Sequence, residues 1–138
     1  MFIYFSVLTT FMKVTILKLE RPKNEINEEI QWFCQSLGLF GERDKEKSCY
    51  RIFIELLKHK NGISSDEIAE HTHITRGTVI HHINKLTDSG LVVSQKNKYK
   101  LRTRNIQHLI KEIEQDIEET FKEMEKIAKK IDQQLKTI

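Results

Sequence analysis

The sequence predicts a mainly α-helical protein that carries one small β-hairpin and ends in a long helix. Three observations lead to this fold class. Apolar residues recur at helical spacing over most of the chain, and only one proline and five glycines interrupt it. A polar turn at residues 95–98 separates two short runs typical of strands. The chain of 138 residues has the length of a single domain with at most one appended element.

Composition excludes several classes of protein. Charged residues make up 31% of the chain and hydrophobic residues 38%, which argues against a disordered or collagen-like protein. Cys34 and Cys49 fit no zinc-ribbon, thioredoxin or disulfide-scaffold spacing, so we expect a reducing, cytoplasmic location. The sequence contains no motif of serine hydrolases, P-loop enzymes, zinc proteases or dinucleotide-binding enzymes. We therefore expect no enzyme, no cofactor and no metal ion.

Residues 1–42 are expected to form an N-terminal extension, a short strand and a helix. The apolar run at 1–11 is too short to span a bilayer and lacks the features of a signal peptide, so we interpret it as either an upstream extension or the result of a mis-assigned start. Residues 13–19 are rich in β-branched and apolar types, which predicts a strand that ends before Pro22. A helix is expected between Asn24, as its cap, and Gly38, as its stop. Its expected buried face consists of Ile26, Ile30, Phe33 and Leu37.

Residues 43–104 are predicted to contain a helix-turn-helix. A first helix, closed by Asn61-Gly62, has a buried stripe made of Cys49, Ile52, Phe53, Leu56 and Leu57, in which Cys49 is expected to be a core thiol. Ser64 and Glu67 then have the spacing of a capping box, which starts a short helix. Thr75 caps a longer helix that runs through Ser89. Two capped helices joined by a tight turn are typical of the helix-turn-helix arrangement.

The second helix of this pair is predicted to have one apolar and one polar face. Val79, Ile83 and Leu86 recur at steps of four and three residues, as expected of a buried stripe. The side chains left at outward positions are all hydrogen-bond donors. These candidate DNA-binding residues are Arg76, Thr78, His81, His82 and Lys85.

A basic β-hairpin is expected to follow Gly90. Residues 91–94 and 99–102 read as two short strands, and residues 90–104 carry a charge of +5 with no acidic side chain. A charge run is more often a solvated surface than a site. Its position beside a helix-turn-helix favours phosphate contact instead. The residues expected to make this contact are Lys96, Lys98, Lys100 and Arg102.

The motifs between residues 48 and 102 resemble the winged helix-turn-helix of ArsR-type and MarR-type transcription regulators, which are prokaryotic proteins, and the archaeal type is the expected one. The resemblance rests on three stretches: Ile63-Ser-Ser-Asp-Glu-Ile-Ala-Glu70, Thr75-Arg-Gly-Thr-Val-Ile-His-His-Ile-Asn-Lys-Leu86 and Asp88-Ser-Gly-Leu-Val92. It implies that the front of the second helix enters the major groove with Arg76, Thr78, His81 and His82. Ile80 departs from the family pattern, which often has a small polar residue there. It either packs against the preceding helix or touches a thymine methyl group.

The histidines give no clear metal-binding pattern. ArsR-type metal sensors carry a cysteine pair or a cluster of His, Asp and Glu on the dimer helices, and neither is present in the sequence. His81 and His82 point about 100° apart on a helix, unlike an i, i+4 chelate. His71 and His73 flank a turn. We expect these imidazoles to be solvated or DNA-facing.

Residues 105–138 read as one long helix that mediates dimerisation as a coiled coil. Apolar residues repeat every seven positions, and a second set occupies the partner heptad position. The alternative is a helix that folds back on its own domain. A helix of about 30 residues is ~45 Å long, however, and would leave part of its apolar stripe exposed on a domain of this size. The expected dimer-interface residues are Ile106, Ile110, Ile113, Ile117, Phe121, Met124, Ile127 and Ile131.

These features together predict a homodimeric transcriptional regulator that binds double-stranded DNA in a sequence-specific manner. The alternative left open is a winged-helix module that binds protein or RNA without sequence-specific DNA binding. No membrane partner is expected, and no small-molecule effector is assigned.

Overall fold

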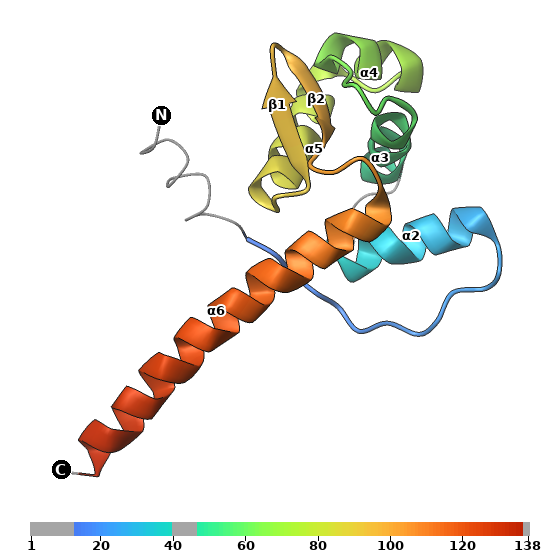
Figure 1. Ribbon diagram of the computed structural model, residues 1–138. Helices are drawn as coiled ribbons and strands as arrows, with labels where there is room; N and C mark the ends of the chain where they lie inside the picture. The colour runs from blue at the N-terminus through green and yellow to red at the C-terminus, as the bar shows by residue number, and fades with distance from the viewer. Residues whose placement is uncertain (1–12, 40–46, 137–138) are drawn as a thin grey trace. The chain divides into compact units, whose positions relative to one another are not determined.

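The computed structural model of the protein describes residues 13–39 and 47–136 (Figure 1). It confirms a mainly helical fold with a small β-wing, a winged helix-turn-helix followed by a long C-terminal helix. The chain divides into two compact units, one ending at Arg102 and one beginning at Thr103. The expected boundary between residues 42 and 43 lies outside the described residues. The elements in chain order are α2 (Ile26–Ser36), α3 (Ser48–Lys58), α4 (Ser65–Thr72), α5 (Arg76–Asp88), β1 (Val92–Gln95), β2 (Lys98–Leu101) and α6 (Ile106–Leu135).

The first unit has a single aliphatic core between α3, α4, α5 and the hairpin. Figure 1 shows these three helices gathered together, and α3 contacts α4, α5 and β2 directly. The stripe predicted for α5 is fully buried, which confirms that prediction. In α3, Leu57 is only half-buried, whereas the other four predicted members are inside. The side chains that are at most 2% exposed include Cys49, Ile52, Phe53, Leu56, Ile63, Ile68, Val79, Ile83, Leu86, Leu91 and Val92.

Both predicted helix caps are present. Ser64 Oγ accepts a hydrogen bond from the Glu67 N–H at 3.1 Å, and Thr75 Oγ1 accepts from the Thr78 N–H at 3.3 Å. The Glu67 carboxylate accepts from the Ser64 hydroxyl at 3.2 Å instead of reaching the Ser64 N–H as a full capping box would. The turn between α4 and α5 closes at His73, which has a left-handed backbone with φ 57°. The capped ends therefore hold the helix-turn-helix predicted from the sequence.

The hairpin is antiparallel and is joined by a two-residue turn. Val92 pairs with Leu101 and Gln95 with Lys98, so Lys96 and Asn97 form the turn, with φ values of 51° and 63°. Two positive φ values are typical of the type I′ turn, which matches the twist of paired strands. The other edge of β2 is also bonded, because Tyr99 exchanges two backbone hydrogen bonds with Ile63, at 2.8 and 2.9 Å. The wing is thereby tied to the segment that leads into α4.

The N-terminal part differs from the prediction in two ways. The prediction of a strand at residues 13–19 was wrong, because these residues have no regular secondary structure. Their backbone bonds to helix ends and not to a strand edge: the Lys13 N–H donates to the Asp88 carbonyl at 3.0 Å, and the Leu17 N–H donates to the Ser36 carbonyl at 2.7 Å. A strand needs a neighbouring strand to pair with, and these N–H groups bond to helix ends instead. Residues 1–11 lie outside the described residues.

The helix predicted between Asn24 and Gly38 is shorter at its N-terminus. It begins at Ile26, and its N-cap is Glu25, which makes no side-chain capping bond, so Asn24 is not the cap. Gly38 has φ 66° and ends the helix as expected. Ile26, predicted to be buried, is 67% exposed, while Cys34 takes the most buried place on the helix. The Phe33 ring stacks on Phe53 of α3 with 6.0 Å between ring centres, which joins α2 to the core.

Both cysteines are free thiols in the core. Cys34 and Cys49 are completely buried. Burial raises the pKa of the Cys34 thiol well above its usual range, and the neighbouring Cys49 raises it further. Because the thiolate is the reactive form, this environment makes Cys34 unreactive. The interpretation of Cys49 as a core thiol is confirmed in its burial.

The long helix α6 has 30 residues and begins after its N-cap Asn105, whose side chain accepts from the His108 N–H at 2.8 Å. Leu109 and Ile113 are its buried residues. Every described residue from Glu118 onward is exposed. Among the described residues, no helix is both long enough and apolar enough to cross a membrane.

Candidate nucleic-acid interface

The polar face of α5 is open to solvent. Burial of the apolar stripe turns the opposite face of the helix outward, and Arg76, Thr78 and His81 are exposed there as predicted. The Thr78 hydroxyl accepts a hydrogen bond from the Thr75 hydroxyl at 2.9 Å, so its own proton can be donated to a ligand. The first two turns of α5 thus present three kinds of hydrogen-bond donor: a guanidinium, a hydroxyl and an imidazole.

Arg76 is oriented by an ion pair with Asp66. Its Nε lies 3.1 Å from Asp66 Oδ1, and both side chains are at least 70% exposed. An exposed pair of this kind contributes only about 0–1 kcal/mol, so a ligand competes with it easily. The contact uses Nε and leaves the two terminal nitrogens of the guanidinium able to face a ligand. Asp66 was not among the residues predicted from the sequence, because no local pattern connects the first turn of α4 with the first turn of α5.

His81 and His82 occupy different environments, although both were predicted to lie at outward positions of the helix. Their rings meet edge to face with 5.4 Å between centres. His81 is exposed, whereas His82 is half-buried and lies nearer the core. Ile80 is also half-buried, which fits either of the two roles considered for it. His81 is therefore the more accessible of the two candidate base-contacting imidazoles.

Lys85 does not point outward as the helical pattern predicted. It is half-buried, and its Nζ donates to the Leu39 carbonyl oxygen at 3.2 Å. The physical reason is that the Leu39 carbonyl comes within reach of the last turns of α5, where it offers the ammonium group an acceptor. A contact between Lys85 and DNA stays a prediction, and it requires this hydrogen bond to break.

Two residues on the exposed face of α5 were not among the sequence-predicted candidates. Asn84 and Gly77 are exposed, and with His81 they follow the spacing i, i+4, i+7, which places all three on one side of the helix. A Cβ atom added to Gly77 meets no other atom within 4 Å among the described residues. Glycine in a helix costs up to about 1 kcal/mol relative to alanine. The described part of the protein gives no steric reason for Gly77, and we expect a ligand to approach its bare surface closely.

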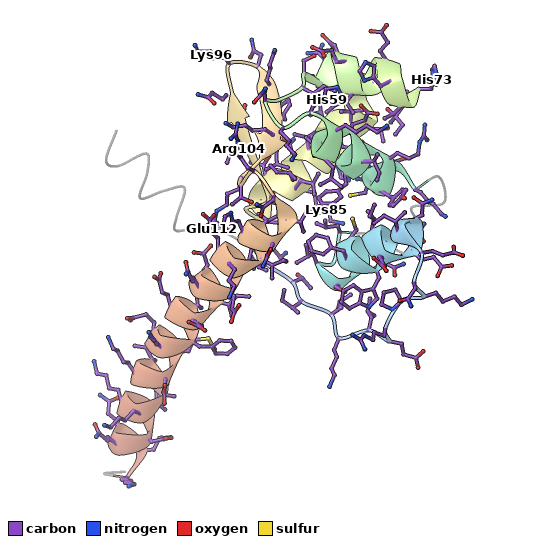
Figure 2. All side chains as sticks on the ribbon, turned by 45° about the vertical axis from the view of Figure 1, so that its right-hand side comes forward. His59, His73, Lys85, Lys96, Arg104 and Glu112 are labelled. Atoms are coloured by element: carbon purple, nitrogen blue, oxygen red, sulfur yellow. The ribbon has the colours of Figure 1, made fainter. Side chains whose placement is uncertain are left out.

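The wing presents positive charge at its tip. Lys96 and Lys98 are exposed, while Lys100 and Arg102 are half-buried toward its base. Figure 2 shows Lys96 at the end of the hairpin. A lysine with φ 51° is less favourable than glycine or asparagine in that conformation. The turn thus has a lysine at Lys96, although the backbone conformation there favours glycine or asparagine.

One comparison with known proteins, the match to a family model, agrees with this geometry. Residues 50–100 match the family model of an HTH domain. That range begins in α3, includes the whole helix-turn-helix and ends within β2. No curated protein and no solved structure matches the chain.

The HTH match supports a DNA-binding regulator with double-stranded DNA as its partner, and such domains are typical of regulators without enzymatic activity. It does not identify the ArsR or MarR subtype or a prokaryotic source, so these stay predictions. It covers α5 and most of the wing, and leaves the roles of the individual side chains to be tested.

We expect Gly77→Ala to stabilise the protein and weaken DNA binding. Alanine removes the conformational cost of glycine, which raises the free energy of unfolding by about 0.5–1 kcal/mol. Its methyl group also separates α5 from a closely approaching groove. Urea denaturation and DNA titration measure the two effects. Thr87→Ala, at the other end of the helix, is the control that leaves DNA affinity unchanged, and unchanged affinity in Gly77→Ala would contradict close approach at this residue.

We expect the double variant Lys96→Ala, Lys98→Ala to bind all duplexes more weakly without a change of preferred sequence. Removing one phosphate contact makes the slope of log K against log salt shallower by about 0.9. Titration of two unrelated duplexes at several salt concentrations measures this slope. Lys126→Ala, an exposed lysine of α6, serves as the control, and a slope identical to wild type in the wing variant would remove the wing from the interface.

Proposed function

We propose that the protein is a transcriptional regulator that binds double-stranded DNA in a sequence-specific manner as a homodimer. The observation that carries this proposal is the exposed polar face of α5, backed by its buried stripe and flanked by a basic wing, inside the segment that matches an HTH domain. The resemblance to ArsR-type and MarR-type regulators supports the same function. We also propose a cytoplasmic location, because the protein must reach its DNA.

In this proposal, α5 enters the major groove and reads base edges. Arg76 makes a bidentate contact to guanine through its terminal nitrogens, which the pair with Asp66 leaves available. Thr78, His81 and His82 contact neighbouring base edges. Asn84 joins them, because an asparagine amide can pair with the N6 and N7 atoms of adenine. The readout thus comes from one helix face that the core holds outward.

The wing holds the DNA backbone in this proposal. Lys96 and Lys98 contact phosphates at the tip, and Lys100 and Arg102 do so from the half-buried base of the wing. Such contacts supply affinity and orientation without sequence information. The division of work between α5 and the wing explains why one element is chemically varied and the other uniformly cationic.

Dimerisation through α6 brings together two copies of α5, and each copy contacts one half of a two-fold symmetric DNA site. In a single chain the apolar stripe of α6 is largely exposed: Phe121, Met124, Ile127 and Ile131 are each between 50 and 61% exposed, and Ile110 is 38% exposed. Ile106 and Ile117 are half-buried, whereas Ile113 is 3% exposed and so contributes least to a surface for a second copy. A row of exposed apolar residues along one helix is stabilised by a second identical helix. We therefore assign residues 105–138 to dimerisation and residues 43–104 to DNA binding.

Selection of bound sequences from random duplex DNA tests the proposal. Wild type is expected to enrich an inverted repeat, because a symmetric dimer presents two identical recognition helices. Arg76→Ala, selected in parallel, is expected to lose its preference at one base pair per half-site and about 1–3 kcal/mol of binding free energy. Absence of any enriched motif for wild type would contradict sequence-specific binding and favour a module for protein or RNA. An equal loss on cognate and scrambled DNA would reassign Arg76 to phosphate contact.

We expect the full-length chain to sediment as a dimer at micromolar concentration and a chain without residues 105–138 to sediment as a monomer. Met124→Glu is a gentler variant, expected to dissociate the dimer because it places a buried charge at the heptad seam. Gln115→Glu adds the same charge on the opposite side of α6 and is expected to remain a dimer. A monomeric wild type would contradict the α6 interface.

A further inference from the structure

A compact group of ionisable side chains lies where α3 and α4 meet, away from the proposed DNA-binding face of α5. It consists of Glu55 in the last turn of α3, His59 directly after α3 and His71 near the end of α4, and the positions of α3, α4 and His59 can be followed in Figure 2. One potential ligand atom from each residue lies within 4.8 Å of those of the other two. Among the described residues, this is the group of His, Cys, Asp and Glu side chains with the proximity needed to hold a metal ion.

The distances within the group agree with those between ligands of one small cation. His71 Nδ1 is 3.0 Å from Glu55 Oε2, and His59 Nδ1 is 3.6 Å from the same oxygen. In a tetrahedral zinc site with bonds of 2.0–2.2 Å, neighbouring ligand atoms are about 3.4 Å apart. The two imidazole rings lie 5.7 Å apart between centres and are inclined by 35°. Small side-chain rotations are therefore enough to direct all three groups at one point.

The group is buried on the side of Glu55 and open to solvent on the side of the two histidines. Glu55 is only 9% exposed, so its carboxylate is held in place, whereas His59 and His71 are progressively more open to solvent. Glu55 and His71 also line a surface hollow of about 500 Å³ between α2, α3 and the end of α4. A buried anionic ligand with two accessible imidazoles provides both a charge for a cation and a path for its entry.

We propose that Glu55, His59 and His71 bind one divalent transition-metal ion of the zinc type, with solvent at a fourth position. Two imidazoles and one carboxylate are a ligand set that suits zinc and its neighbours better than magnesium or calcium, which prefer oxygen ligands. This site differs from the expectation that His71 is a turn residue without a metal role. Glu55 and His59 are four residues apart on one helix side, but His71 reaches them only through the packing of α4 against α3.

Without a metal ion, His59 and His71 both contact Glu55. His59 Nδ1 is 2.9 Å from the Glu55 carbonyl oxygen, and Lys58 Nζ is 3.9 Å from Glu55 Oε1. Metal binding requires an unprotonated nitrogen on each imidazole, so an ion bound to His59 Nδ1 takes the place of its contact with the Glu55 carbonyl. Lys58 is 64% exposed and contacts the other carboxylate oxygen, so it can remain solvated while Oε2 binds the ion.

A bound ion would connect two helices of the DNA-binding unit. Arg51 of α3 already donates to the Thr72 carbonyl at the end of α4, one residue after His71. A metal–ligand bond through His71 reinforces this junction. Because the three ligands are separated in an unfolded chain, an ion that binds them together favours the folded state.

The test uses the purified full-length protein after treatment with a chelator. Zinc titration by calorimetry is expected to give one ion per chain and a rise in thermal unfolding temperature, and cobalt is expected to give the visible absorption of a tetrahedral site. His59→Gln and His71→Gln keep polar side chains at these partly exposed positions and are expected to bind at least tenfold more weakly, with no rise in unfolding temperature. His108→Gln, an exposed histidine of α6, is the matched control and is expected to behave as wild type.

Circular dichroism without metal verifies that each variant is folded, and Glu55→Gln adds a third ligand variant at the buried position. The proposal is overturned if wild type binds no stoichiometric zinc, or if the His59 and His71 variants bind zinc as tightly as His108→Gln. The readouts involve no DNA, so they are independent of the proposed regulatory function.

Discussion

The burial of three side chains of α5 determines the arrangement of the DNA-binding unit. Val79, Ile83 and Leu86 lie completely inside the core, where α3, α4 and the wing meet them. A helix anchored along one stripe has no freedom to rotate, so its opposite face must point to solvent. Truncating a buried Ile or Leu in such a core costs about 2–5 kcal/mol, which is a large share of the stability of a small domain. The proposed readout by α5 therefore depends on the same interaction that keeps the unit folded.

The sequence predicted the elements whose signals are local. Ser64 and Thr75 cap their helices as expected, since capping depends on hydrogen bonds within three residues. The wing was predicted to within one residue at each end, because its turn and its flanking runs are adjacent in the chain. The buried stripe of α5 follows from helical periodicity alone. These features need no knowledge of what packs against them.

The features that sequence reasoning missed depend on contacts between distant segments. The apolar run at 13–19 resembles a strand, but whether it pairs depends on an available edge, and its N–H groups bond to helix ends instead. Lys85 has an outward position by periodicity, yet the Leu39 carbonyl, 46 residues earlier, attracts its ammonium group. The group of Glu55, His59 and His71 arises in the same way, from the packing of α4 on α3. Polar partners of this kind leave no periodic signal in the chain.

Helix α4 carries no proposed base contact, but it contacts both α3 and α5 and leads directly into the turn before α5. At its N-terminal end, Asp66 pairs with Arg76 at the start of α5. At its C-terminal end, the Thr72 carbonyl accepts from Arg51, and His71 contacts the buried Glu55. The exposed Asp66 pair is weak and the half-buried contacts to α3 are stronger, so α4 is anchored mainly at the end that leads directly into the turn before α5. Whatever strengthens that anchor, an added ligand included, restrains the turn and with it the direction in which α5 leaves the core.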